Sequence, residues 1–249
     1  MASATETEQI KQCCRLAAQV REEVRTLLRP GVRTRDLDAY AEERIGRLGA
    51  RPAFKGYRGY PATVCVSIDE EVVHGIPGER RLKEGDLVSL DLGVFYAGFY
   101  ADTAVCDPVG QADEEGLRLI RVTREAFLAG LAQARAGRHV SDISHAVQKC
   151  VERAGFSVVR EFVGHGIGRQ MHEEPQIPNY GEPGRGMVLV SGQVLAVEPM
   201  VNEGSPAVHV KDDGWTAVTV DGKRSAHHEH TILVTGGDPE VLTAGASDA

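Results

Sequence analysis

The sequence lacks any apolar run long enough to cross a membrane, and it also lacks an export signal. A bilayer span needs roughly 20 consecutive apolar residues, and no segment approaches that length. The opening residues, MASATETEQ, contain neither the basic region nor the apolar centre of a signal peptide. We therefore expect a cytoplasmic protein that has no membrane partner.

Clusters of basic residues are also missing. The chain of 249 residues has 28 Lys and Arg against 36 Asp and Glu, which gives a formal net charge of -8. The basic residues are scattered along the chain and form no patch that could follow a phosphate backbone. We therefore exclude nucleic acid as the expected substrate.

The cysteines give no sign of a disulfide framework. Five of them, at positions 13, 14, 65, 106 and 150, form an odd set that contains no CxxC spacing. We interpret most of them as small buried hydrophobic residues.

The chain begins with a predicted pair of helices. Apolar residues recur at helical spacing from Ile10 to Leu27, and this run stops before Pro30. A second helix is predicted from Thr34 to about Leu48.

A similar pair follows later in the chain. An apolar run at 119–134 precedes SDISHAVQKCVERAGF, which echoes the earlier TRDLDAYAEERIGRLGA. Leu37 then corresponds to Ile143, an offset of 106, and Asp91 corresponds to Glu198, an offset of 107. Two offsets this similar favour a duplicated helix, helix, strand module. The alternative is a chance similarity between amphipathic segments.

Segments of β character lie between and after the helices, at 64–68, 87–104, 193–202 and 215–235. The class is therefore α+β, with two duplicated modules around a central antiparallel sheet. The expected organisation is a flexible N-terminus at 1–9, a single domain at 10–240 with pseudo-repeats at about 15–104 and 119–235, and a flexible C-terminus at 241–249.

The segment LVSLDLGVFYAGFYADTAV predicts a β-hairpin that brings two aspartates together. If Tyr96 and Ala97 form the centre of its turn, Asp91 directly faces Asp102. Their Cβ atoms would lie roughly 5 Å apart, where like charges repel by roughly 3 kcal/mol at an effective dielectric of about 20. Either one carboxyl is protonated with a raised pKa, or a cation lies between the two. Two solvated aspartates on an outer face are the structural alternative.

Two further carboxylates interrupt apolar strands. Glu198 lies within VLAVEPM and Glu229 within HHEHTILV, where a carboxylate is costly unless it is paired or bound to a metal. His165 lies between glycines in FVGHGIG, which leaves its ring free to reach a ligand. One imidazole with four carboxylates is an oxygen-rich set suited to Mn, Fe, Co or Zn. Two divalent cations would balance the four negative charges.

The histidines beside Glu229 form a second candidate cluster, which contains His227, His228 and His230. Strand alternation turns His228 and His230 to the face opposite Glu229. We therefore interpret these two as structural or supporting residues.

Taken in order, these segments resemble the type I methionine aminopeptidases from roughly Arg15 to Val234. The motifs are GYRGYPATVCVSIDEEVVHGIP, SLDLG with GFYADT, GHGIGRQMHEEPQIPNYG, AVEPMVN and HHEHT. The resemblance implies the pita-bread fold, a pseudo-symmetric α+β domain, in its short bacterial form.

The resemblance also implies a set of metal ligands, namely Asp91, Asp102, His165, Glu198 and Glu229. Asp102 and Glu229 would bridge two metals, Asp91 would chelate one of them, and His165 with Glu198 would complete the other. The cofactors would be two divalent ions, drawn from Co, Mn, Fe or Zn.

Residues that match the substrate-contacting positions of the family are also present. His74 and His172 would hydrogen-bond the scissile amide and its tetrahedral intermediate. The pocket for the methionine side chain would be lined by Tyr57, Tyr60, Cys65, Met171 and Trp215. Met171 replaces the aromatic residue that is more usual at its position.

The implied reaction is removal of the initiator methionine from nascent, deformylated proteins whose second residue is small and uncharged. A hydroxide shared by the metals would attack the methionine carbonyl, while Glu198 relays a proton to the leaving amine. The expected partners are the N-terminal peptides of nascent chains, with the ribosome as a further candidate. The enzyme is expected to be a monomer.

Three alternatives stay open at this point. The first is a proline-directed aminopeptidase or dipeptidase of the same fold, and the second is a pita-bread protein that binds peptides or ribosomes without catalysis. The third is a cysteine hydrolase that uses Cys65 with His74.

Overall fold

The computed structural model describes residues 4–245, and four α-helices lie within them. The helices are α1 (Ala4–Arg25), α2 (Thr34–Arg47), α3 (Glu114–Leu131) and α4 (Val140–Arg153), with one short 3-10 helix, η1 (Tyr57–Gly59). No helix in this range is long and apolar enough to cross a bilayer.

Most strands belong to one antiparallel sheet of nine strands. Its main path is β1 (Arg51–Pro52), β4 (Leu87–Tyr96), β5 (Phe99–Pro108), β14 (Glu229–Leu233), β9 (Val194–Val197), β7 (Gly164–Gly166) and β8 (Glu173–Ile177). β2 (Val64–Ile68) pairs with β4, and β15 (Glu240–Val241) pairs with β14.

Two smaller antiparallel sheets complete the β structure. One contains β13 (Ser225–His227), β10 (Met200–Asn202) and β6 (Ser157–Val158). The other contains β11 (Val208–Val210), β12 (Ala217–Thr219) and β3 (Glu71–Val73).

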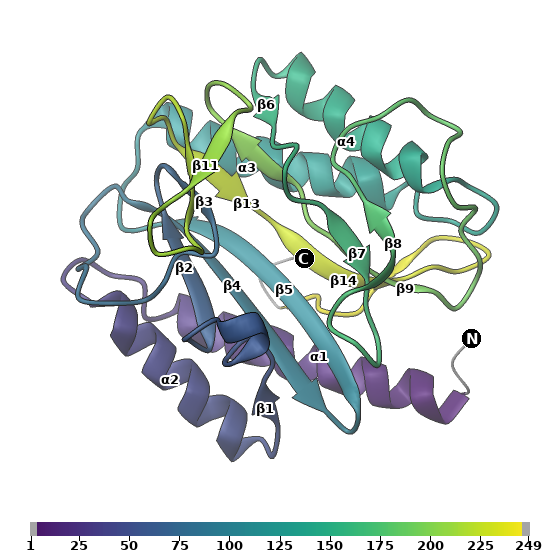
Figure 1. The fold of residues 1–249 in the computed structure, drawn as a ribbon, viewed down its shortest axis with the longest axis horizontal. Coiled ribbons are helices and arrows are strands. Elements are labelled where there is room, and N and C mark those ends of the chain that lie inside the picture. The colour runs from purple at the N-terminus through teal and green to yellow at the C-terminus, as the bar shows by residue number, and fades with distance from the viewer. Residues whose placement is uncertain (1–3, 246–249) are drawn as a thin grey trace.

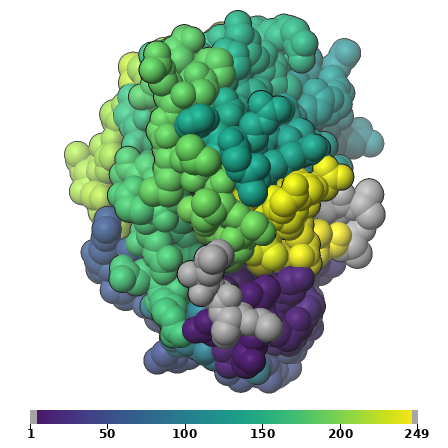
Figure 2. All heavy atoms as spheres, turned by 90° about the vertical axis from the view of Figure 1, so that its right-hand side faces the viewer, coloured from purple at the N-terminus to yellow at the C-terminus, as the bar shows by residue number. Residues whose placement is uncertain are grey.

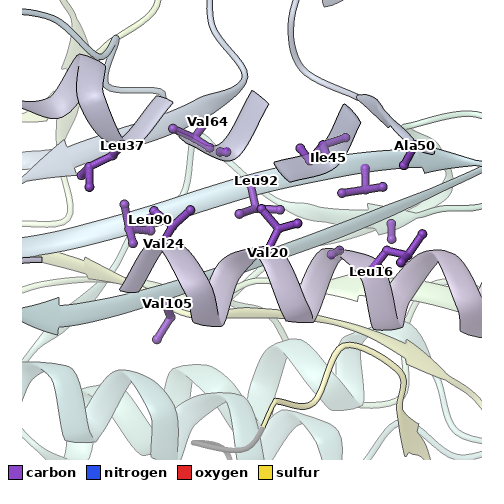
Figure 3. Close-up of a cluster of buried hydrophobic side chains, with 14 of the residues drawn as sticks. Leu16, Val20, Val24, Leu37, Ile45, Ala50, Val64, Leu90, Leu92 and Val105 are labelled. Carbon is purple, nitrogen blue, oxygen red and sulfur yellow. The ribbon is translucent and has the colours of Figure 1, made fainter. Parts of the chain in front are cut away.

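The two helix pairs lie at opposite ends of the large sheet, as Figure 1 shows for α1 with α2 and for α3 with α4. Val20 and Val24 of α1 pack against Leu90 and Leu92 of β4 in the first core (Figure 3). Leu37 of α2 belongs to the same core.

The second helix pair has a core of its own. Ile143 of α4, the predicted counterpart of Leu37, is buried in a separate cluster with residues of β9 and β14. Corresponding positions in the two modules thus fill equivalent places in two cores.

The ordered part extends beyond the expected domain limits at both ends. Helix α1 already begins at Ala4, within the segment expected to be flexible. At the other end, Leu242 and Thr243 are buried, and Lys11 of α1 forms a 2.7 Å ion pair with Glu240. Figure 2 shows this yellow C-terminal segment against the purple start of the chain. Residues 1–3 and 246–249 of the expected flexible ends lie outside the described residues.

The register of the β4–β5 hairpin differs from the predicted one. The turn is centred on Ala97 and Gly98, both of which have positive φ angles, so Asp91 pairs with Ala104 and Asp102 pairs with Gly93. The prediction of directly facing aspartates is therefore wrong. A two-residue hairpin turn of type I′ needs positive φ at both centres and favours Gly at the second. This preference moves the turn by one residue, and it leaves the aspartates as diagonal neighbours on one face.

Glycines allow strand β7 to approach both of its neighbours closely. A Cβ atom on Gly164 would lie 2.4 Å from the Ala196 carbonyl oxygen of β9, and one on Gly166 would lie 2.3 Å from the Glu174 carbonyl oxygen of β8. Neither backbone can move without breaking the sheet. The two glycines around His165 therefore serve strand packing, which differs from the predicted role of freeing its ring.

We expect Gly164→Ala to lower the free energy of unfolding by more than about 1 kcal/mol, because overpacking against backbone typically costs about 1–3 kcal/mol. Gly46→Ala is the matched control, since that helical glycine has open space around its Cβ direction. Alanine should be neutral or stabilising there by up to about 1 kcal/mol. Urea unfolding of both variants measures the difference, and equal stability of the two would contradict the packing argument.

Candidate metal centre and substrate pocket

Five neighbouring strands each bring one polar side chain to a common pocket. In sheet order, β4 contributes Asp91, β5 Asp102, β14 Glu229, the end of β9 Glu198, and β7 His165. The sheet thus gathers residues that are distant in sequence. All five side chains named in the sequence analysis come together.

Small residues separate these side chains within the sheet. Ala104 of β5 pairs with Asp91 on one side and with Glu229 on the other. Ala196 of β9 pairs with His165. Because paired residues share a face, the two alanines leave space between larger neighbours. That space is where ligand atoms can converge.

Hydrogen bonds fix the backbone at Asp102 and Glu198. Thr231 Oγ1 donates to the Asp102 carbonyl at 2.8 Å and accepts from the Asp102 N–H at 3.1 Å. The Asn179 amide donates to the Glu198 carbonyl at 3.0 Å. These bonds hold the main chain, so the two carboxylates stay available for other partners.

His165 is held in a defined tautomer. Its Nδ1 lies 2.9 Å from the Gly166 carbonyl oxygen, which can only accept, so Nδ1 carries the hydrogen. Nε2 therefore presents a lone pair, and it lies 3.5 Å from Glu198 Oε1. Burial lowers the pKa of His165 to about 4. A neutral ring of fixed orientation is the usual form of a metal-ligating histidine.

The carboxylates are buried close to one another, and this arrangement favours their protonated forms. Burial raises the pKa of Asp91 to about 7. Burial, followed by repulsion from neighbouring carboxylates, also raises the pKa values of Asp102, Glu198 and Glu229. Without a cation, the cluster can hold few charges at once.

Several buried oxygens of the cluster have no hydrogen-bond partner. These unpaired oxygens are Asp91 Oδ1, Asp102 Oδ1 and Glu229 Oε1. One ligand atom from each of Asp102, His165 and Glu229 falls within 4.8 Å of the others. Unpaired buried oxygens around an oriented imidazole are a donor set that fits a divalent cation. Asp91 and Glu198 line the same pocket.

The remaining wall of the pocket is largely apolar and aromatic. It is formed by the predicted residues Tyr57, Tyr60, Cys65, Met171 and Trp215, together with Phe54 and Arg58. The rings of Tyr60 and Trp215 meet edge to face at 5.1 Å. Gly93 beneath the pocket leaves room for Met171, because a Cβ atom there would lie 2.9 Å from Met171 Cε.

Two histidines face the pocket from different segments. His172 stacks on Tyr57, and its Nδ1 lies 2.9 Å from the Tyr57 hydroxyl oxygen. His74 adopts a left-handed backbone conformation, with φ of 61°, and its ring meets that of Phe162 edge to face. Such a φ is uncommon outside glycine, and where it occurs it often aims a functional side chain.

The structure separates the three clustered histidines. His228 and His230 pack with Phe127, on the face opposite the carboxylates, as alternation predicted. His227 lies instead within 4.0 Å of Glu198 and Glu229. His227 lies two residues before Glu229, and strand alternation places residues two apart on the same face. This spacing could have identified His227 from the sequence.

Phe54 and Arg58 were not singled out from the sequence. Phe54 precedes the GYRGY motif and carries no chemical signature, while Arg58 lies inside that motif. Only the tertiary structure shows that both line the pocket.

Cys65 is poorly suited to act as a nucleophile. Its side chain is buried, and burial raises the pKa of its thiol well above the ordinary value. A reactive cysteine requires the thiolate. The geometry therefore argues against the cysteine hydrolase alternative.

Fold and pocket together define a metal-dependent hydrolase of the pita-bread class. The chain belongs to metallopeptidase family M24, whose sequence profile matches residues 8–236. This agrees with the fold that the sequence predicted.

Individual relatives agree with this assignment. The methionine aminopeptidase of Clostridium perfringens is 52% identical over 216 residues, which cover 87% of each chain. The crystal structure of the methionine aminopeptidase from Thermotoga maritima superposes with a TM-score of 0.95, at 49% identity, and covers 97% of this chain and 98% of that one. The prolidase of Pyrococcus furiosus has a TM-score of 0.81 at 23% identity, and the match covers 98% of this chain and 65% of that chain. This last likeness concerns the fold alone.

The carboxylate cluster should make the metal-free protein less stable as pH rises from about 7.5 to about 8.5. The folded state keeps carboxyl protons that the unfolded state releases near pH 4, so folding binds protons in this window. The expected slope is up to about 1.4 kcal/mol per pH unit for each retained proton. Histidines with lowered pKa values act in the opposite sense, and because the unfolded state still holds about half of their protons at pH 6.5, this effect fades only by about pH 7.5.

Urea unfolding of chelator-treated protein at about pH 7.5, 8.0 and 8.5 measures this slope. Glu229→Gln removes one group whose pKa is raised well above its ordinary value, and it should flatten the slope. Stability that rises or stays constant across this window would contradict the proton-retaining cluster.

Proposed function

We propose that this protein is a methionine aminopeptidase, which hydrolyses the first peptide bond of chains that begin with methionine. One observation carries the proposal. A single pocket is lined on one side by four carboxylates and a histidine, and on the other by apolar and aromatic side chains. A hydrolytic centre and a binding site for one apolar side chain are thus adjacent.

The apolar side of the pocket suits methionine. The volume of the whole pocket is about 150 Å³, which is smaller than the roughly 300–1,000 Å³ of pockets that hold drug-sized ligands. One side chain is therefore the natural occupant. Cys65 and Met171 present sulfur and flexible apolar surface, which adapt well to an unbranched thioether.

We propose that Asp91, Asp102, His165, Glu198 and Glu229 hold two divalent metal ions. The unpaired carboxylate oxygens and the oriented Nε2 of His165 support this assignment. When bound, the ions would act as Lewis acids and lower the pKa of water. Asp102 and Glu229 would be the ligands shared by both ions, as the family resemblance implies, and their ligand atoms lie within 4.8 Å of each other and of that of His165.

The other polar residues are assigned to proton movement and orientation. Glu198 faces the pocket and retains some exposure, so it is the proposed carrier of the proton to the leaving amine. The Tyr57 hydroxyl can donate to His172 Nδ1, which leaves the Nε2–H of His172 to donate to the substrate carbonyl. His74 is the second proposed donor at the scissile amide. Its low pKa of about 4 keeps the ring neutral.

Loss of a bridging ligand should remove both metal binding and turnover. We expect Asp102→Asn and Glu229→Gln to lower kcat by more than about 10³-fold, since even outer partners of metal ligands commonly contribute about 10–100-fold. Calorimetric titration of the metal-free variants with Mn²⁺ tests the cause directly. Asp238→Asn is the control, because this side chain is 84% exposed and is not among the residues that line the pocket. Wild-type Mn²⁺ stoichiometry in either ligand variant would refute the bridging assignment.

Cleavage should depend on the size of the second residue. Tyr57, Arg58 and His172 line the pocket, and the centroid of the His172 ring lies 4.2 Å from that of the candidate ligand His165, so a branched second side chain should clash there. We expect kcat/KM for Met-Ala-Ser to exceed that for Met-Leu-Ser by about 10² or more, which requires only about 3 kcal/mol of differential transition-state binding.

The peptide Ala-Pro-Ser serves as the comparison in this assay. Preferential cleavage of Ala-Pro-Ser would indicate a proline-directed enzyme. No cleavage of any of the three peptides by the Mn²⁺-loaded protein would indicate a binding protein.

A further inference from the structure

His227, the last residue of β13, is buried beside the carboxylate cluster without a hydrogen-bond partner. Its exposure is 2%, and neither ring nitrogen has a partner. Nε2 lies 3.9 Å from Glu229 Oε2 and 4.0 Å from Glu198 Oε2. These distances exceed the roughly 2.7–3.2 Å of an N–H···O hydrogen bond. His227 Nε2 therefore lies near both carboxylates but is not hydrogen-bonded to either of them.

The main chain fixes the position of His227. His227 pairs with Met200 across the β13–β10 ladder, and its N–H donates to Ser89 Oγ at 3.2 Å. The two glutamate side chains, by contrast, extend from their strands on several rotatable bonds. Their carboxylates can approach the ring more easily than the ring can approach them.

The chemistry of the ring makes it a donor to these glutamates. A neutral imidazole always carries one N–H, and a buried donor without an acceptor is unfavourable. Glu229 Oε1 is also buried without a partner. His227 is not among the residues that line the pocket. His227 therefore adjoins the two carboxylates without itself lining the substrate pocket.

We propose that His227 is a positioning residue, whose Nε2–H donates to Glu229 and orients this carboxylate toward the metal site. The inference rests on the proposed metal-binding function. Metal ligands generally receive such outer hydrogen bonds, which fix their orientation and raise affinity. Glu229 is the assigned acceptor because its side chain is 3% exposed against 13% for Glu198, and because its Oε1 has no hydrogen-bond partner.

Mn²⁺ affinity of the metal-free protein tests this role without reference to turnover. His227→Leu removes both nitrogens at similar volume, and we expect it to weaken Mn²⁺ binding about 10–100-fold in calorimetric titration. His227→Gln keeps an N–H donor of similar reach, so it should stay within about threefold of the wild type. His227→Asn has a shorter amide and should resemble the leucine variant, which preserves the test if leucine prevents folding.

His228→Gln is the matched control, because the adjacent ring packs on Phe127 and His230 on the opposite face. It should leave Mn²⁺ affinity unchanged. Thermal unfolding of all the metal-free variants shows whether any loss of affinity reflects a loss of fold.

The visible spectrum of the Co²⁺-loaded protein distinguishes a positioning residue from a ligand. Unchanged Co²⁺ bands in His227→Gln, with affinity preserved, would support the proposal. Loss of affinity in both the glutamine and leucine variants, with shifted bands, would make His227 a ligand and overturn it. Wild-type affinity in the leucine variant would overturn it as well. If the wild-type protein itself binds no Mn²⁺, the proposed function fails rather than the role of His227.

Discussion

The confinement of four carboxyl groups to one largely buried pocket is the constraint on which the site depends. Asp91, Asp102, Glu198 and Glu229 lie in one pocket, where burial favours their neutral forms. A fold that held them loosely would let them separate and reach water. The nine-stranded sheet prevents this, because each carboxylate is attached to a different strand within a continuous hydrogen-bonded network. Rigidity thus keeps together groups that would otherwise move apart, and a bound cation turns this unfavourable arrangement into a binding site.

The sequence was sufficient to predict the module organisation and the identities of the clustered residues. Helical periodicity gave the second helix nearly to its last residue, and the similar offsets anticipated the two cores that contain Leu37 and Ile143. Carboxylates inside apolar strands are costly enough to be noticed without a structure. The sequence therefore predicted which residues form the site more reliably than it predicted how those residues are arranged.

What the sequence could not supply were facts decided by backbone conformation and tertiary packing. The hairpin register depended on positive φ angles at Ala97 and Gly98, and a shift of one turn position changed which residue faces Asp91. The glycines around His165 were expected to free its ring. They are needed instead because carbonyl oxygens of the neighbouring strands lie too close for a Cβ atom. Arg58 lines the pocket from the short helix η1, which no apolar periodicity in the sequence predicts.

A buried arginine lies on the face of the sheet behind the site. Arg21 of α1 is fully buried, and its guanidinium donates to Thr103 Oγ1 at 2.6 Å, one residue beyond Asp102. A buried guanidinium is tolerable only with strong partners, and here Glu22 also pairs with it at 2.9 Å. Because Thr103 and Asp102 point to opposite faces of β5, the arginine cannot contact the pocket directly. Thr103 Oγ1 in turn donates to the Glu229 carbonyl at 3.1 Å. The first helix therefore supports the strands that carry Asp102 and Glu229 through hydrogen bonds as well as through the core.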